Sequence, residues 1–120
     1  MDIEFSELPW HDAVLLNIVI DRRNPEKNDQ VIVDIQWPNG RKNSLVFSDC
    51  YRVDASMNFG IIASDSILDA SLIDQSLDLS KIKEKWMQIG VDLKTLKCFE
   101  IETNSTGSLL HIYSLGYSLR

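Results

Sequence analysis

The sequence predicts an α+β domain that is mainly antiparallel β, with about six strands and one helix. Within residues 31–37 every odd position is apolar, while Asp34 and Gln36 lie between them, a period of two that is typical of a strand with one buried face. Residues 79–89 space their apolar side chains three or four positions apart, which is the period of an amphipathic helix. The remaining apolar segments are short and are separated by turn residues, which favours strands joined as hairpins.

The first half of the chain is expected to form a three-stranded meander. The even-numbered residues from Val14 to Ile20 are apolar and are predicted to lie on one face of the first strand. Residues 31–37 form the second strand and residues 44–53 the third. Asn39 and Gly40 between them readily adopt positive φ, which predicts a tight turn.

The second half is expected to add more strands and the helix. Residues 57–62 and 66–73 are predicted as strands, although the second segment also tolerates one or two helical turns. The helix over 79–89 is expected to be capped by Ser80 or Asp78 and to end at Gly90. Residues 97–103 and 108–119 then form a C-terminal hairpin. The sheet is expected to be a sandwich or an open barrel within one domain spanning residues 1–120.

Composition narrows the function classes. A net charge of -6 argues against a general nucleic-acid binder, because phosphate binding needs clustered lysine and arginine. The sequence has no signal-like start and no apolar run of membrane-spanning length, so we expect a cytoplasmic protein without membrane contact. The two cysteines, Cys50 and Cys98, are expected to be reduced and mostly buried.

The charge is unevenly distributed along the chain. Between Val53 and Ser80 there are five aspartates and no lysine or arginine: Asp54, Asp65, Asp69, Asp74 and Asp78. The stretch is interpreted as a set of solvated faces, and alternatively as an acidic patch for a basic protein.

His11 and Asp12 stand side by side before the first strand and raise the question of catalysis. With Cys50 nearby in space they would supply the nucleophile and base of a thiol hydrolase. Neighbouring residues of an extended segment point to opposite faces, however, which places Asp12 poorly for orienting the His11 ring. The favoured interpretation is therefore structural, with Trp10 as an apolar anchor and Asp12 as a cap of backbone N–H groups. The sequence has no metal-ligand spacing or phosphate-binding glycine loop, and no cofactor is expected.

Two further segments contain side chains whose polarity does not match the predicted environment: a carboxylate on an apolar strand face, and apolar residues in a possible loop. Alternation places Asp49 on the apolar face of the third strand together with Tyr51. A bulge at Ser48–Asp49 is the favoured solution, and pairing of Asp49 with a group such as His11 is the alternative. Met57, Asn58 and Phe59 would form an apolar contact tip if exposed, but Met57 and Phe59 are expected to plug the end of the core.

The segments "LPWHD", "LVFSDCYRV", "MNFGII" and "TNSTGS", in this order, resemble those of small single-domain bacterial proteins of unknown function. More distantly, the layout is similar to the β-rich immunity proteins of polymorphic toxin systems. That resemblance implies tight binding and neutralisation of a toxin domain without catalysis, and it carries over no individual residue.

The sequence thus favours a non-catalytic interaction protein, of immunity type, that binds a protein partner of basic character or a second copy of itself. The alternative is a small hydrolase or ligand-binding enzyme using His11, Asp12 and Cys50. The candidate contact residues are Trp10, His11, Asp12, Asp49, Tyr51, Met57, Asn58 and Phe59.

Overall fold

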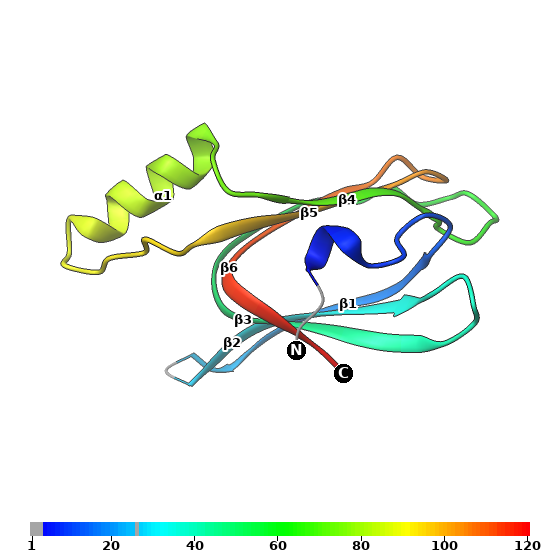
Figure 1. Ribbon diagram of the computed structural model, residues 1–120, viewed down its shortest axis with the longest axis horizontal. Helices are drawn as coiled ribbons and strands as arrows, with labels where there is room; N and C mark the ends of the chain where they lie inside the picture. The colour runs from blue at the N-terminus through cyan, green and yellow to red at the C-terminus, as the bar shows by residue number, and fades with distance from the viewer. Residues whose placement is uncertain (1–3, 26) are drawn as a thin grey trace.

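The computed structural model describes residues 4–25 and 27–120. In this part of the chain six strands form one antiparallel sheet in the order β1-β2-β3-β6-β5-β4, with one α-helix outside it (Figure 1). This confirms the predicted mainly antiparallel fold with one helix. In chain order the elements are η1 (Phe5–Glu7), β1 (Val14–Asn24), β2 (Asn28–Gln36), β3 (Lys42–Ser56), β4 (Ile67–Ile73), α1 (Leu77–Met87), β5 (Lys97–Thr103) and β6 (Leu109–Leu119).

The predicted meander and the C-terminal hairpin are both present. Strand β1 pairs with β2, β2 with β3 and β5 with β6, all antiparallel. The turn between β2 and β3 contains Gly40 at φ 86°, and the side chain of Asn39 accepts a hydrogen bond from the Arg41 N–H at 2.9 Å. Strand β6 lies between β3 and β5, so the second half of the chain joins the first half along β3.

The sheet bends back on itself at β3 and β6 (Figure 1). Within β3, Asp49 adopts φ 54°, and a register shift against β6 lies between Cys50 and Arg52. Such bulges increase local bending and twist. As a result the β1–β2 hairpin faces the β4–β5 side of the sheet across the interior (Figure 1).

The two edges of the bent sheet meet at one point. Val14 at the start of β1 forms an isolated antiparallel bridge with Ser66, just before β4. The Leu15 N–H donates to the Asp65 carbonyl at 2.9 Å, and the Ile67 N–H donates to the Ala13 carbonyl at 2.7 Å. This contact places the segment that precedes β4 beside the beginning of β1.

The main core fills the interior of the bend. Val31, Val33 and Ile35 of β2 and Trp37 directly after it are all buried, as their spacing predicts. Phe5 of η1 enters from the open side and contacts the rings of Phe47 and Phe99 at centroid distances of 6.2 and 5.0 Å. The N-terminal segment is therefore part of the core.

Helix α1 covers a second, smaller core on the other face of the sheet. Leu79 and Ile82 pack with Cys98 and Tyr113 there. The helix begins at Leu77, earlier than expected, because Ser76 is its N-cap and its Oγ accepts a hydrogen bond from the Leu79 N–H at 3.1 Å. The prediction of Ser80 or Asp78 as the cap is therefore wrong. No helix in the described residues is long and apolar enough to cross a membrane.

Two other predictions about local structure are wrong. Residues 57–62 form a loop and not a strand, whereas the strand predicted at 66–73 is confirmed as β4. On β1, Ile20 keeps the orientation of Ile18 although it is 58% exposed, whereas Leu16, which is 45% exposed, does not share the face of Ile18. A register shift between Leu15 and Asn17 inserts one residue and interrupts the expected alternation.

Candidate partner-binding site

The loop between β3 and β4 exposes a group of large apolar side chains. Phe59 is 87% exposed, Ile61 is 55% exposed, and Ile62 is fully exposed. The expectation that Phe59 plugs the core is wrong, while Met57 is half-buried at the base of the loop. Adjacent exposed apolar side chains of this size are typical of contact surfaces, since isolated ones are ordinary but clustered ones are not.

Both ends of this loop are held by the turn between β5 and β6, which lies next to it in Figure 1. The Asn58 N–H donates to Ser108 Oγ at 2.9 Å, and the Asn58 side-chain amide donates to the carbonyls of Thr106 and Gly107. Ser105 Oγ donates to the Ser64 carbonyl at 2.7 Å. Asn58 is thus a positioning residue for the apolar tip.

A groove of about 460 Å³ lies between this loop and the start of β1. Strand β1 contributes residues 15–18 to its wall, and the loop contributes Met57, Phe59 and Ile61 among others. The side chains that line the groove include no lysine or arginine. The groove and the tip together form a mostly apolar surface, which we call the β1–loop surface, defined by residues 15–18 and 57–65.

Asp65 places one carboxylate in the groove. It is half-buried and accepts hydrogen bonds from the Thr106 N–H at 3.3 Å and from Thr106 Oγ1 at 3.2 and 3.1 Å. These donors are neutral, and no cationic side chain among the described residues lies within 4.0 Å of this carboxylate. The groove therefore presents a negative charge that is hydrogen-bonded but not neutralised.

The predicted anchor Trp10 is buried, and its neighbours His11 and Asp12 are not. Trp10 Nε1 donates to the Phe5 carbonyl at 2.6 Å, and its ring contacts that of Trp37 at a centroid distance of 5.2 Å. Asp12 adopts φ 64°, and this turn of the backbone brings its Oδ2 to 3.5 Å from His11 Nε2. The side chains of His11 and Asp12 are 91% and 76% exposed, so their contact is largely screened by water. Asp12 meets the His11 ring and not the backbone N–H groups that it was expected to cap.

The hydrolase constellation is not assembled. Cys50 lines a pocket with Ile20 and Val31, which pair at the far end of the β1–β2 hairpin from His11. Val14 and Ile20 are separated by about 20 Å along β1, given a rise of about 3.3 Å per residue, and His11 precedes Val14. Desolvation raises the pKa of the Cys50 thiol to about 11, and Sγ lies 3.2 Å from the Phe47 carbonyl, to which it donates. Cys50 therefore has neither a base nor a stabilised thiolate.

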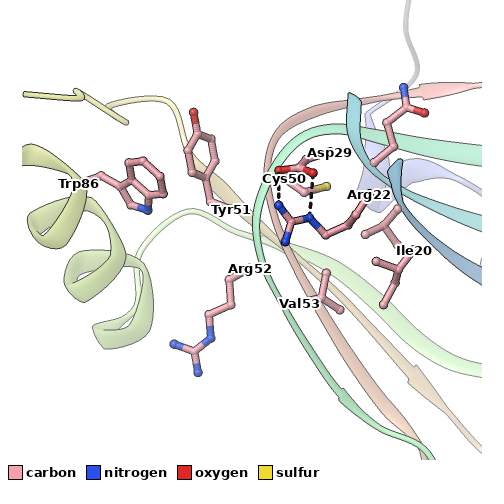
Figure 2. A pocket seen from close by; sticks show the side chains of 10 residues that line it. Ile20, Arg22, Asp29, Cys50, Tyr51, Arg52, Val53 and Trp86 are labelled. Atoms are coloured by element: carbon pink, nitrogen blue, oxygen red, sulfur yellow. Dashed lines mark hydrogen bonds and ion pairs between the residues drawn. The ribbon is translucent and has the colours of Figure 1, made fainter. Parts of the chain in front are cut away.

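The pocket at Cys50, shown in Figure 2, has a volume of about 450 Å³. Arg22 Nε and Asp29 Oδ1 are 2.9 Å apart beside Cys50, so these two charges neutralise each other. Tyr51, a predicted contact residue, packs edge to face on Trp86 of α1 at a centroid distance of 5.0 Å. This arrangement explains Tyr51 as part of the contact between sheet and helix.

Asp49 is exposed, as the bulge interpretation requires, and its left-handed φ of 54° turns it away from the core. The register shift lies between Cys50 and Arg52, later than the predicted Ser48–Asp49 step. Asp49 lies at the Cys50 end of the molecule and does not meet His11.

Comparison with known proteins adds no assignment, since no family model matches the chain and no curated protein matches it significantly. The described residues contain no group of three or more metal-ligating side chains. Sequence reasoning identified Met57, Asn58 and Phe59 of this site but missed Leu16, Ile61 and Ile62. The Ile61–Ile62 pair follows Gly60 in the sequence and does not alternate with polar residues, whereas the exposure of Leu16 depends on the β1 bulge.

Proposed function

We propose that this chain is a non-catalytic interaction protein of immunity type, which binds a partner protein through the β1–loop surface and neutralises it. The observation that carries the proposal is the tip of the β3–β4 loop. Phe59, Ile61 and Ile62 are exposed together, while hydrogen bonds from Asn58 and Ser105 hold the loop in place. A preorganised apolar tip loses little conformational entropy on binding.

The charge of the chain supports a basic partner. The net charge is -6, and the groove contains a carboxylate without a cationic neighbour. Opposite charge on a partner would accelerate association and make it sensitive to salt. Self-association as a homodimer is the alternative occupant of the same surface.

We further infer that the bent sheet is an open barrel and that the chain acts in the cytoplasm. The bridge between Val14 and Ser66 supports the barrel description, because it joins the two sheet edges at one end. The free thiols of Cys50 and Cys98 support a reducing compartment.

The test is co-expression with the product of the gene adjacent to its own, under separately controlled promoters, with growth and complex formation as readouts. We expect the adjacent product to stop growth when expressed alone. The chain should restore growth and co-purify with that product. The double variant Phe59→Ser, Ile62→Ser should lose both effects.

The matched control is the double variant Leu77→Ser, Ile89→Ser. Both residues are 70% exposed apolar side chains near the ends of α1, away from the β1–loop surface. This variant should restore growth like the unmodified chain. A harmless adjacent product, the absence of a complex at micromolar concentration, or equal loss in both double variants would contradict the proposal.

A further inference from the structure

We propose that the free edge of β1 accepts an extended segment of the partner protein as an added strand, and that a lysine or arginine of this segment pairs with Asp65. This inference rests on the proposed function, because it specifies how the β1–loop surface recognises its partner. Strand addition at a sheet edge combines main-chain hydrogen bonds with side-chain pockets that select every second residue.

The hydrogen bonds of β2 establish which side of β1 is free. The Trp37 N–H donates to the Arg41 carbonyl at 2.8 Å, so the odd-numbered positions of β2 direct their backbone groups toward β3. Alternation along an antiparallel ladder then directs the even-numbered positions of β2 toward β1. One of these even positions is Ile32, which pairs with Val19.

It follows that the N–H and C=O groups of Val19 point toward β2. The residues on either side of Val19, and every second residue after them, direct their N–H and C=O groups away from the sheet. These alternate residues are Ile18, Ile20 and Arg22. Within residues 4–25 and 27–120, β1 pairs only with β2, apart from the bridge at Val14. An outward row of unpaired backbone groups is the template that strand addition requires.

The groove continues this edge toward the start of β1. The bulge after Leu15 leaves Leu16 exposed, and Ile18 belongs both to the groove wall and to the free edge. A strand lying along Ile18 and Ile20 would therefore extend one end into the groove, against Phe59 and Ile61. Apolar side chains at alternate positions of that strand fit this wall.

Asp65 favours an added strand that carries a positive charge. The carboxylate is half-buried among apolar side chains, and its hydrogen-bond donors come from the neutral Thr106. A lysine or arginine entering the groove would neutralise the carboxylate, whereas an uncharged strand would bury it without a charge partner, at a free-energy cost.

A second copy of the chain fits this surface less well than a basic segment. Its own β1 carries two cations, but Arg22 is paired with Asp29 at 2.9 Å and Arg23 with Asp21 at 2.8 Å. Two copies would also bring together two chains with a net charge of -6 each. The occupant to which we commit is therefore an apolar strand with a free cation, from a different protein.

The first test is selection of nine-residue peptides from a random display library on the full chain and, in parallel, on its Asp65→Asn variant. Asparagine retains an oxygen that can accept from Thr106 but removes the charge. We expect the peptides selected on the unmodified chain to have apolar residues at alternate positions and to share one lysine or arginine. Selection on the Asp65→Asn variant should not enrich this cation. Peptides selected on the unmodified chain should bind the variant about fivefold more weakly.

The second test distinguishes strand addition from contact by side chains alone. Ile20→Pro removes an outward N–H at a position where an edge strand tolerates proline, and Ile20→Thr removes the apolar side chain but keeps the N–H. Both variants should remain folded by circular dichroism. We expect Ile20→Pro to weaken binding of a selected peptide by at least about tenfold, as loss of main-chain bonds and a steric block predict, with a smaller effect of Ile20→Thr. Hydrogen exchange should show new protection of the Ile18, Ile20 and Arg22 amides when the peptide is bound.

Three outcomes would overturn this inference. Peptides that depend on Phe59 and Ile62 but tolerate Ile20→Pro would leave the proposed function standing and refute strand addition. Peptides without a shared cation would refute the role of Asp65, and a library that yields no binder would refute the edge as a peptide site. A dimer in gel filtration that Ile20→Pro dissociates would assign the edge to a second copy.

Discussion

Two phenylalanines of this chain occupy opposite environments, and the same substitution separates their roles. Phe5 is almost fully buried and contacts four aromatic rings, whereas Phe59 is 87% exposed. We expect Phe5→Ala to lower the free energy of unfolding by about 3–5 kcal/mol, through lost burial and a residual cavity. Phe59→Ala should change it by less than about 0.5 kcal/mol. Urea denaturation of both variants measures the difference, and a large loss for Phe59→Ala would contradict the exposed loop.

Cys50 provides a second prediction at the scale of one residue. Desolvation raises its pKa from 9.0 to about 11, so below pH 9 its thiolate fraction is roughly one hundredth of that of an ordinary thiol. In a Cys98→Ala background, Cys50 should react with a disulfide reagent about a hundredfold more slowly in the folded chain than in urea. The folded-state rate should continue to rise with pH beyond pH 9, because the thiolate forms only near the raised pKa. A fast reaction at neutral pH would indicate an activated cysteine and would revive the hydrolase hypothesis.

The candidate site was only partly predictable because its residues depend on backbone conformation. The neighbours His11 and Asp12 were expected to point apart, and they meet because Asp12 adopts a left-handed φ of 64°. Asp49 was recognised as incompatible with a buried face, and a bulge is present about two residues later than predicted, between Cys50 and Arg52. The sequence therefore showed where a polar side chain does not fit a regular strand. The directions of the Asp12 and Asp49 side chains, however, follow from φ values that no periodicity encodes.

Helix α1 offers a prediction at the scale of an element. Ser76 accepts a hydrogen bond from the Leu79 N–H, whereas Ser80 lies within the first turns and is exposed. Ser76→Ala should destabilise the chain by about 1 kcal/mol, the usual value of an N-cap. Ser80→Ala, the matched control, should be neutral within about 0.5 kcal/mol, since alanine favours the helix interior. Thermal unfolding of the two variants decides between them, and equal effects would show that the helix begins elsewhere.

The predictability of each element follows from how far its burial is set by local sequence. Strand β2 lies between β1 and β3, and the apolar residues at its odd positions were sufficient to predict its buried face. Strand β1 is an edge strand with a bulge, which reversed the inferred orientation of Leu16 relative to Ile18. Residues 57–62 have strand-like composition but form a loop, because the chain turns there from the end of β3 toward β4 on the other edge of the sheet. Long-range pairing, which a single sequence does not display, decided these two cases.

At the scale of the whole molecule, one contact assembles the β1–loop surface. The bend at β3 and β6 carries the β3–β4 loop from one half of the sheet to the edge of the other (Figure 1). The hydrogen bonds of Leu15 and Ile67 around the Val14–Ser66 bridge then hold Asp65 and the loop beside β1. The groove exists only because the two sheet edges meet, so its shape is a property of the complete fold.

A disulfide across this bridge tests the arrangement of the whole molecule. Val14 and Ser66 lie between the two hydrogen bonds of the bridge, which makes them a non-hydrogen-bonded antiparallel pair, and such pairs have Cα atoms about 4.5 Å apart. That separation is compatible with disulfide geometry. In a chain with Cys50→Ala and Cys98→Ala, the changes Val14→Cys and Ser66→Cys should give a disulfide on mild oxidation of the folded protein. The bond should raise the free energy of unfolding by about 2–4 kcal/mol relative to the same variant reduced, because it closes a long loop in the unfolded state. Peptide mapping detects the bond, and denaturation with and without reductant measures its effect. If the two thiols remain free in the folded chain, the sheet edges do not meet at this point, and the β1–loop surface does not exist in the form described.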